Sequence, residues 1–191
     1  MKNNTNDHGT LSLAVVSILL FCAIFPCLLL VITGTVQLSI SSFAVDSKDR
    51  LYVGTTKEIS IYEHGEMVGS INPKTSRTYR FTITEEDTIL LSTSDKIYIM
   101  DLEGNVLETK EDLGADVYNQ LSYKKKTFTS PNGDVYKLHN LGRSKITKND
   151  TEVVFQISGL SATIKYILFA AFIMLFLYLV AMLTRRSKAS W

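Results

Sequence analysis

The chain has 191 residues, 46% of them hydrophobic, and 20 Lys and Arg against 19 Asp and Glu give a formal net charge of +1. This near balance gives no basis for a nucleic-acid partner, and we expect none. The length alone would indicate one or two domains, but two long uncharged segments change that expectation.

The first uncharged segment covers residues 11–33, behind a polar N-terminus at 1–10. Its 23 residues would form a helix of about 34 Å, long enough for a bilayer core of about 30 Å. A cleaved signal peptide is the alternative. We favour a retained transmembrane helix, because the apolar stretch is long for a signal and only Lys2, opposed by Asp7, is basic before it.

The central segment, residues 34–163, contains an internal repeat. The 29 residues that start at Phe43 align with those that start at Phe81, an offset of 38 positions, and each unit has a glycine turn, EHGE or LEGN. A third, looser unit starts at Phe128, where KND replaces the glycine turn. Repeats of this period are typical of propellers and solenoids.

Each unit predicts four short strands. Leu51 and Val53 alternate with Tyr52 and Gly54, which is the two-residue period of a strand with two unlike faces. The joints DSKD, TEED and SPNGD hold the residue types that hairpin turns require. The expected fold is an all-β, β-propeller-like domain of about three four-stranded repeats between two transmembrane α-helices.

The first unit resembles a blade of the NHL-type and related six-bladed propellers. Such blades commonly read apolar-x-Val-Asp, a short turn and an apolar-Tyr-Val strand, and Val45, Asp46 and the run 51–53 fit this pattern. The run 99–105, IMDLEGN, fits the later hydrophobic-x-Asp-x-x-Gly element. The resemblance covers about 41–108 and implies binding, scaffolding or, occasionally, hydrolytic or lyase chemistry, so it does not decide the function.

Three blades would leave sheet edges and one side of the propeller open. We expect one of three solutions: the insertion Lys110–Lys126 covers the edge, a second copy completes a six-bladed ring, or another membrane protein covers the open face. The lysines at 124–126 fit a solvated edge, with an anionic wall polymer or lipid head groups as the alternative.

The second uncharged run, Tyr166–Leu183, predicts a transmembrane helix over 164–184 followed by a basic tail at 185–191. Arg185, Arg186 and Lys188 place this tail in the cytoplasm. Two spans then place both termini inside and the central domain outside the cell membrane. The domain contains no cysteine, which suits a bacterial exterior better than an animal one.

The residues give no sign of a catalytic, cofactor-binding or metal site. His8, His64 and His139 stand in separate contexts, without the spacing of zinc ligands. The acidic loops DSKD and TEED lack the spacing of a calcium loop and are expected to be hairpin turns. Cys22 and Cys27 lie in the first apolar run and are expected to be apolar helix residues.

These observations predict a membrane-anchored, extracytoplasmic binding module rather than an enzyme. It would be an accessory or sensory subunit of a membrane complex and would need no cofactor. Its expected partners are the lipid bilayer and either a second copy or another membrane protein. A cell-envelope hydrolase or lyase on a propeller scaffold and a structural homo-oligomer are the alternatives.

Overall fold

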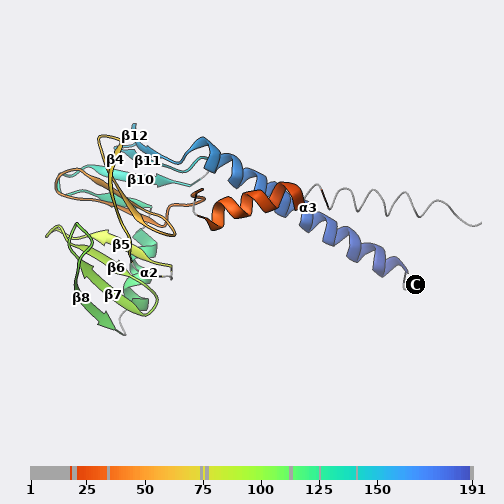
Figure 1. Ribbon diagram of the computed structural model, residues 1–191, viewed down its shortest axis with the longest axis horizontal. Helices are drawn as coiled ribbons and strands as arrows, with labels where there is room; N and C mark the ends of the chain where they lie inside the picture. The colour runs from red at the N-terminus through yellow and green to blue at the C-terminus, as the bar shows by residue number, and fades with distance from the viewer. Residues whose placement is uncertain are drawn as a thin grey trace, which may run out of the picture. The chain divides into compact units, whose positions relative to one another are not determined.

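The computed structural model describes residues 18, 21–33, 35–73, 75, 78–111, 114–124, 126–140 and 142–189 (Figure 1). The chain divides into two compact units. One is the β domain, Ser39–Ser158, and the other comprises the flanking segments up to Leu38 and from Gly159.

The β domain contains three antiparallel four-stranded sheets, and each is one repeat of the sequence. The first sheet comprises β1 (Ser42–Val45), β2 (Leu51–Gly54), β3 (Ile59–Glu63) and β4 (Glu66–Ile71). The second comprises β5 (Arg80–Ile83), β6 (Ile89–Ser92), β7 (Lys96–Met100) and β8 (Val106–Glu111). The third comprises β9 (Thr127–Thr129), β10 (Val135–His139), β11 (Lys145–Lys148) and β12 (Glu152–Gln156). Three four-stranded, blade-like repeats are therefore confirmed.

The repeat phenylalanines occupy equivalent places in the three sheets. Phe43 pairs with Val53, Phe81 with Leu91, and Phe128 with Tyr136, always between the first and second strands. The predicted offset of 38 residues carries the bounds of β1 and β2 onto those of β5 and β6. The repeat is therefore a repeat of strand register as well as of sequence.

The first sheet lies between the other two, because β1 packs against both β5 and β9. Ala44, Tyr52 and Ile59 share a core with residues of the second sheet. On the opposite face, Phe43 meets Phe128 and Tyr62 meets Phe155 of the third sheet, with ring centroids 6.5 and 5.0 Å apart. Both β1 and β2 are consequently buried along their whole length. Alternate residues of these strands therefore face different sheets, and both faces are buried.

The insertion at 110–126 was weighed as a cover over a sheet edge, and its described residues cover a sheet face instead. Its first residues end β8, and α2 (Gly114–Lys124) packs against β5, β6 and β7. The Arg80 guanidinium lies 5.3 Å from the Tyr118 ring centre. Because Phe81 points into the core shared with the first sheet, its neighbour Arg80 points the other way. The α2 helix therefore covers the far face of the second sheet.

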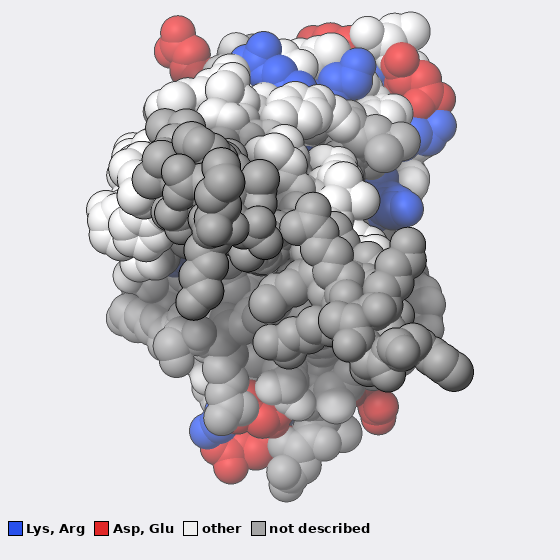
Figure 2. Space-filling model, turned by 90° about the vertical axis from the view of Figure 1, so that its right-hand side faces the viewer, with Lys and Arg blue, Asp and Glu red and all other residues white. Residues whose placement is uncertain are grey.

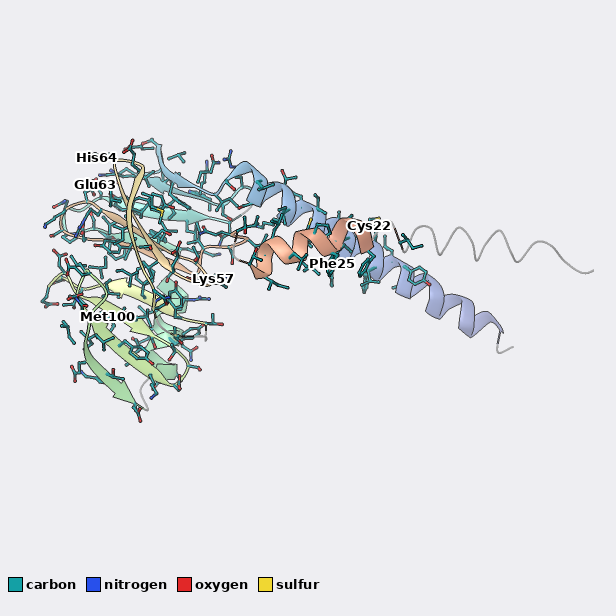
Figure 3. The ribbon with its side chains drawn as sticks, viewed as in Figure 1. Cys22, Phe25, Lys57, Glu63, His64 and Met100 are labelled. Carbon is teal, nitrogen blue, oxygen red and sulfur yellow. The ribbon has the colours of Figure 1, made fainter. Side chains whose placement is uncertain are left out.

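The three sheets share two distinct ends. The hairpins that join the first and second strands, and the third and fourth strands, of every sheet lie together at what we call the turn end. The chain enters near Ser39 and leaves near Ser158 at the opposite end, the chain-exit end, where the Ile157 amide donates to the Ser144 carbonyl. Figure 3 shows Glu63 and His64 at the turn end and Lys57 at the chain-exit end.

The flanking unit is helical. The α3 helix (Gly159–Ala189) includes an apolar stretch, Gly159–Tyr178, of mean hydropathy 2.1, and this is the one helix among the described residues long and apolar enough to cross a bilayer. A shorter apolar helix, Phe21–Ile32, lies within the predicted first span at 11–33, of which residues 11–17, 19 and 20 fall outside the described residues. The described part of this helix is too short to cross a bilayer, so the predicted pair of spans is not confirmed. Cys27, Val36 and Ile164 form a small core within this unit.

Candidate functional site

The turn end is built from one repeated hairpin. In four hairpins, the first turn residue donates its amide to the carbonyl four residues on and accepts from the amide three residues on. The fourth position of each has a positive φ: Asp49 at 64°, Asp87 at 56°, Gly104 at 90° and Gly133 at 85°. This is the geometry of a type I turn closed by a left-handed residue, which Gly, Asn and Asp tolerate best. The acidic loops DSKD and TEED are such hairpins, as expected.

Asp46, the aspartate of the Val-Asp motif, stabilises the first hairpin from inside the domain. Its side chain is fully buried and accepts hydrogen bonds from the Lys48 and Arg50 amides at 3.0 and 2.8 Å. The Arg50 Nε donates at 2.7 Å and the Tyr52 hydroxyl at 3.3 Å. A buried carboxylate needs this many donors to offset its lost hydration. The motif residue is therefore structural.

One polar tie joins the turn ends of the first and second sheets. The Ser47 amide donates to Asp87 Oδ1 at 3.0 Å, and the Ser47 hydroxyl donates to the other carboxylate oxygen. These hydrogen bonds lower the pKa of Asp87, chiefly through the hydroxyl. The tie fixes how the two turns lie beside each other.

A larger polar tie joins the first and third sheets. Lys148 Nζ lies 2.8 Å from a carboxylate oxygen of Asp49 and 2.8 Å from one of Asp134. The Tyr136 hydroxyl donates to Asp49 at 2.6 Å, and Lys148 Nζ stands 5.5 Å from the Tyr136 ring centre. Four side chains from two sheets thus form one hydrogen-bonded group, which we call the Asp49 tie.

The pKa values of the groups in the Asp49 tie are shifted away from neutral pH. The hydrogen bonds that Lys148 donates to Asp134 and, to a smaller extent, to Asp49 raise the pKa of Lys148 above its ordinary value. Burial, helped by the bond to Asp49, raises the pKa of Tyr136 to about 12. Burial opposes ionisation of Asp49, but its bonds to Lys148 and Tyr136 lower the pKa overall. At physiological pH the group therefore consists of one ammonium, two carboxylates and a neutral tyrosine.

A cleft of about 340 Å³ opens beside the Asp49 tie, between the first and third sheets. Tyr62, Tyr136 and Leu51 supply its apolar wall. Charged and polar groups surround its mouth, with His64 and Glu63 from the β3–β4 hairpin and Glu152 from β12. Its mixed lining of aromatic and charged groups is typical of a surface that recognises another molecule.

A second cavity, of about 410 Å³, lies where the first strands of the three sheets approach one another. Phe43, Phe81 and Phe128 line it, together with Leu121 of α2 and hydroxyl side chains. Among the described residues that line it there is no Asp, Glu, Lys, Arg or His, so these residues offer apolar and hydroxyl contacts.

The structure separates the histidines that were weighed as metal ligands. His64 lies at the mouth of the cleft, whereas His139 Nε2 is 2.9 Å from the Thr147 hydroxyl on the far face of the third sheet. His8 lies outside the described residues. Among the residues that the structure describes, no group of three His, Cys, Asp or Glu side chains could hold a metal ion.

Sequence reasoning missed the residues of the Asp49 tie. Tyr136 and Lys148 are 87 and 99 positions from Asp49 along the chain, so no local pattern links them. The available signal was the repeat itself, which places Asp49 and Asp87 at the same turn position. Only the packing of the sheets shows that each of these aspartates reaches a neighbouring repeat.

Comparisons with known proteins leave the family open. No family model matches the chain, and no curated protein matches it. Among solved structures it is similar to a protein of unknown function from Bacteroides caccae (11% identity, TM-score 0.33) and to the WD40 β-propeller domain of Doa1 (14%, 0.34). It is also similar to Hsv2 from Kluyveromyces marxianus (12%, 0.30).

These alignments cover 63%, 63% and 61% of this chain and 46%, 40% and 38% of the respective structures. The chain therefore spans less than half the length of each. The propeller-like arrangement of this protein stands on its own three four-stranded sheets.

Proposed function

We propose that this protein is a membrane-anchored, extracytoplasmic interaction module that binds a partner protein or ligand in the cleft at its turn end. The observation that carries the proposal is the cleft between the first and third sheets, whose walls the Asp49 tie holds in place. A preorganised wall lowers the entropy cost of binding. As an accessory or sensory subunit, the module would present this cleft to a membrane complex.

The membrane part of the proposal is supported by α3 and by the charges that follow its apolar stretch. Arg185, Arg186 and Lys188 favour a cytoplasmic C-terminus, and a first span over 11–33 would return the N-terminus to the same side. The β domain between the spans would then face the exterior. This orientation, with two spans in the cell membrane, is part of the proposal.

An enzyme of the hydrolase or lyase class is less well supported by the cleft. General acids and bases work best when their pKa lies near the working pH. The pKa values of Lys148 and Tyr136 are raised and that of Asp49 is lowered, so each moves away from neutrality. These groups also bond to one another, which suits a structural role.

Completion of a six-bladed, NHL-type ring by a second copy also has little support. Ring closure would require the far faces of the second and third sheets to pack on further sheets. The α2 helix covers the former, while Lys137, His139 and Lys145 lie on the latter. Charged and polar side chains on this face would lose hydration without gaining partners.

Site-specific photo-crosslinking in membranes tests the binding proposal. A benzoyl-phenylalanine at His64, at the mouth of the cleft, should give one discrete adduct, and the same group at His139 on the far face of the third sheet should give none. Glu152→Trp, which places bulk at the mouth of the cleft at an exposed position, should remove the adduct. Adducts of equal yield from both positions, or adducts indifferent to Glu152→Trp, would rule out a binding site in the cleft.

Cysteine labelling tests the location. In a Cys22→Ser, Cys27→Ser background, Thr56→Cys adds a thiol at an exposed turn of the β domain. A membrane-impermeant maleimide should label it in intact cells to the same extent as in lysed cells. Labelling that requires lysis would place the β domain inside and would disprove the proposed orientation.

A further inference from the structure

The two ends of the β domain differ sharply in charge. The six hairpins of the turn end, residues 46–50, 63–66, 84–88, 101–105, 130–134 and 148–152, hold twelve Asp and Glu and three Lys and Arg. At the chain-exit end, the connecting segments with the strand ends that border them, residues 54–59, 71–80, 92–96, 111–127, 139–145 and 156–158, hold among their described residues seven Lys and Arg and four Asp and Glu. The domain is therefore polarised from an acidic to a basic end.

The basic side chains are accessible to a charged surface. Lys57 and Lys126 are exposed, Lys145 is half-buried, and Arg143 is exposed although its Nε donates to the Ile157 carbonyl at 2.7 Å. Lys96 forms a salt bridge with Glu111, and Lys110 forms one with Glu108, so their charges are partly neutralised. In Figure 2, Lys and Arg lie mainly along the upper and right-hand parts of the surface in view, with Asp and Glu interspersed at the upper edge and more Asp and Glu at the lower edge.

The covalent connection to α3 limits how far this basic end can be from a bilayer that α3 crosses. Only Ile157 and Ser158 separate β12 from α3, and two extended residues span at most about 7 Å. From Gly159 to Lys165, just before the apolar run, the helix rises by roughly 10 Å. Together these lengths place the chain exit at most roughly 17 Å from the lipid surface, so the connection is short enough to let the basic end contact the head groups, where charges interact within the Debye length of about 8 Å.

We propose that the basic chain-exit end docks on anionic phospholipid head groups of the outer leaflet, on the same side of the membrane as the β domain, so that the acidic turn end is held away from the membrane with its cleft open to partners. The occupant is a lipid surface because of the charge complementarity and the short chain connection. This inference rests on the proposed membrane anchoring. Attraction at one end and repulsion at the other orient the domain without any further contact.

Hydrogen exchange of the full chain in nanodiscs tests the docking. Discs of zwitterionic lipid are compared with discs that contain about a third anionic phosphatidylglycerol. Amides at 55–58 and 142–145, at the chain-exit end, should exchange several-fold more slowly in the anionic discs. The difference should disappear at high salt because screening shortens the reach of the charges. Amides at 63–66, at the turn end, should exchange equally in both.

Charge variants make the test specific. In the triple variant Lys57→Glu, Lys126→Glu, Lys145→Glu, the dependence of amide exchange on lipid charge should vanish, since each lysine near an anionic surface contributes about five-fold in affinity. Lys137→Glu, on the far face of the third sheet, is the matched control and should retain the lipid dependence of the exchange. Unchanged exchange in the strands β2 and β6 of every variant shows that the fold is intact.

The outcomes separate the two proposals. Equal exchange in the two lipids, or a lipid effect that survives in the triple variant, overturns the docking while leaving the anchoring in place. Failure of the chain to remain in nanodiscs, or its extraction from membranes by alkaline carbonate, overturns the anchoring and the docking with it.

Discussion

The first and third sheets have the same strand order but different surroundings. The first is covered by another sheet on each face, so every residue of β1 and β2 is buried. The third is covered on one face, and β10 shows alternating burial, with Tyr136 and Leu138 inside. The difference shows that position in the assembly, rather than strand pattern, decides which side chains carry the stability.

Core truncations should give the largest contrast between these sheets. In the first sheet, the side chains of Ile59 and Val53 point to opposite faces. Ile59→Ala should lower the free energy of unfolding by about 2 to 5 kcal/mol and Val53→Ala by about 2 kcal/mol, since each substitution leaves a cavity. In the third sheet, Ile146→Ala should cost about as much as Ile59→Ala, but Val153→Ala on the other face less than about 0.5 kcal/mol. Urea unfolding followed by circular dichroism measures all four. A costly Val153→Ala would mean that the third sheet is also covered on both faces.

Added bulk should show how tightly the inner strands of the first sheet pack. A Cβ at Gly54 would lie 2.7 Å from Ser41 Oγ and 2.8 Å from the Phe81 ring, so Gly54→Ala should destabilise by about 1 to 3 kcal/mol. Gly69→Ala, in the outer strand β4, would meet Ile61 at an ordinary 3.7 Å and should be close to neutral. Thermal unfolding of the pair gives the comparison. Equal melting temperatures would contradict tight packing between the first two sheets.

The Asp49 tie should contribute modestly, because its ion pair is partly exposed. In a double-mutant cycle with Asp49→Asn and Lys148→Gln, we expect a coupling of about 0.5 to 1 kcal/mol. The same cycle with Lys137→Gln and Asp150→Asn, an exposed pair within the third sheet, is the control and should couple more weakly. A coupling near zero between Asp49 and Lys148 would mean that the Asp49 tie does not join the sheets energetically.

The smallest effect concerns acid stability. The pKa values of Asp49 and Asp87 are lowered in the folded state, so their contribution is complete above the pKa of an unfolded Asp, about 4. It is lost as the pH falls through the lower folded values. Asp49→Asn should therefore flatten the decline in stability below about pH 4, as measured by urea midpoints across pH. A variant with the same acid dependence as the parent would exclude this contribution.

Much of the architecture was predictable because it is local. The two-residue alternation and the Asp and Gly turns specify strands and hairpins, and an offset of 38 residues specified two equivalent sheets. The third unit was predicted despite its altered turn. In the structure, Asn149 and Asp150 adopt the positive φ that glycine would supply. The α2 helix was not predicted, since its stabilisation comes from packing on the sheet face that it covers.

The amino-acid sequence by itself determined the number of repeats, the four strands of each and the hairpins that join them, because these depend on residues close along the chain. Only the tertiary structure decided that the first sheet is central, that α2 covers the second, and that Asp49 meets Tyr136 and Lys148. These features depend on which faces meet across about a hundred residues. Side-chain packing and charge pairing at that separation leave no periodic trace in the sequence.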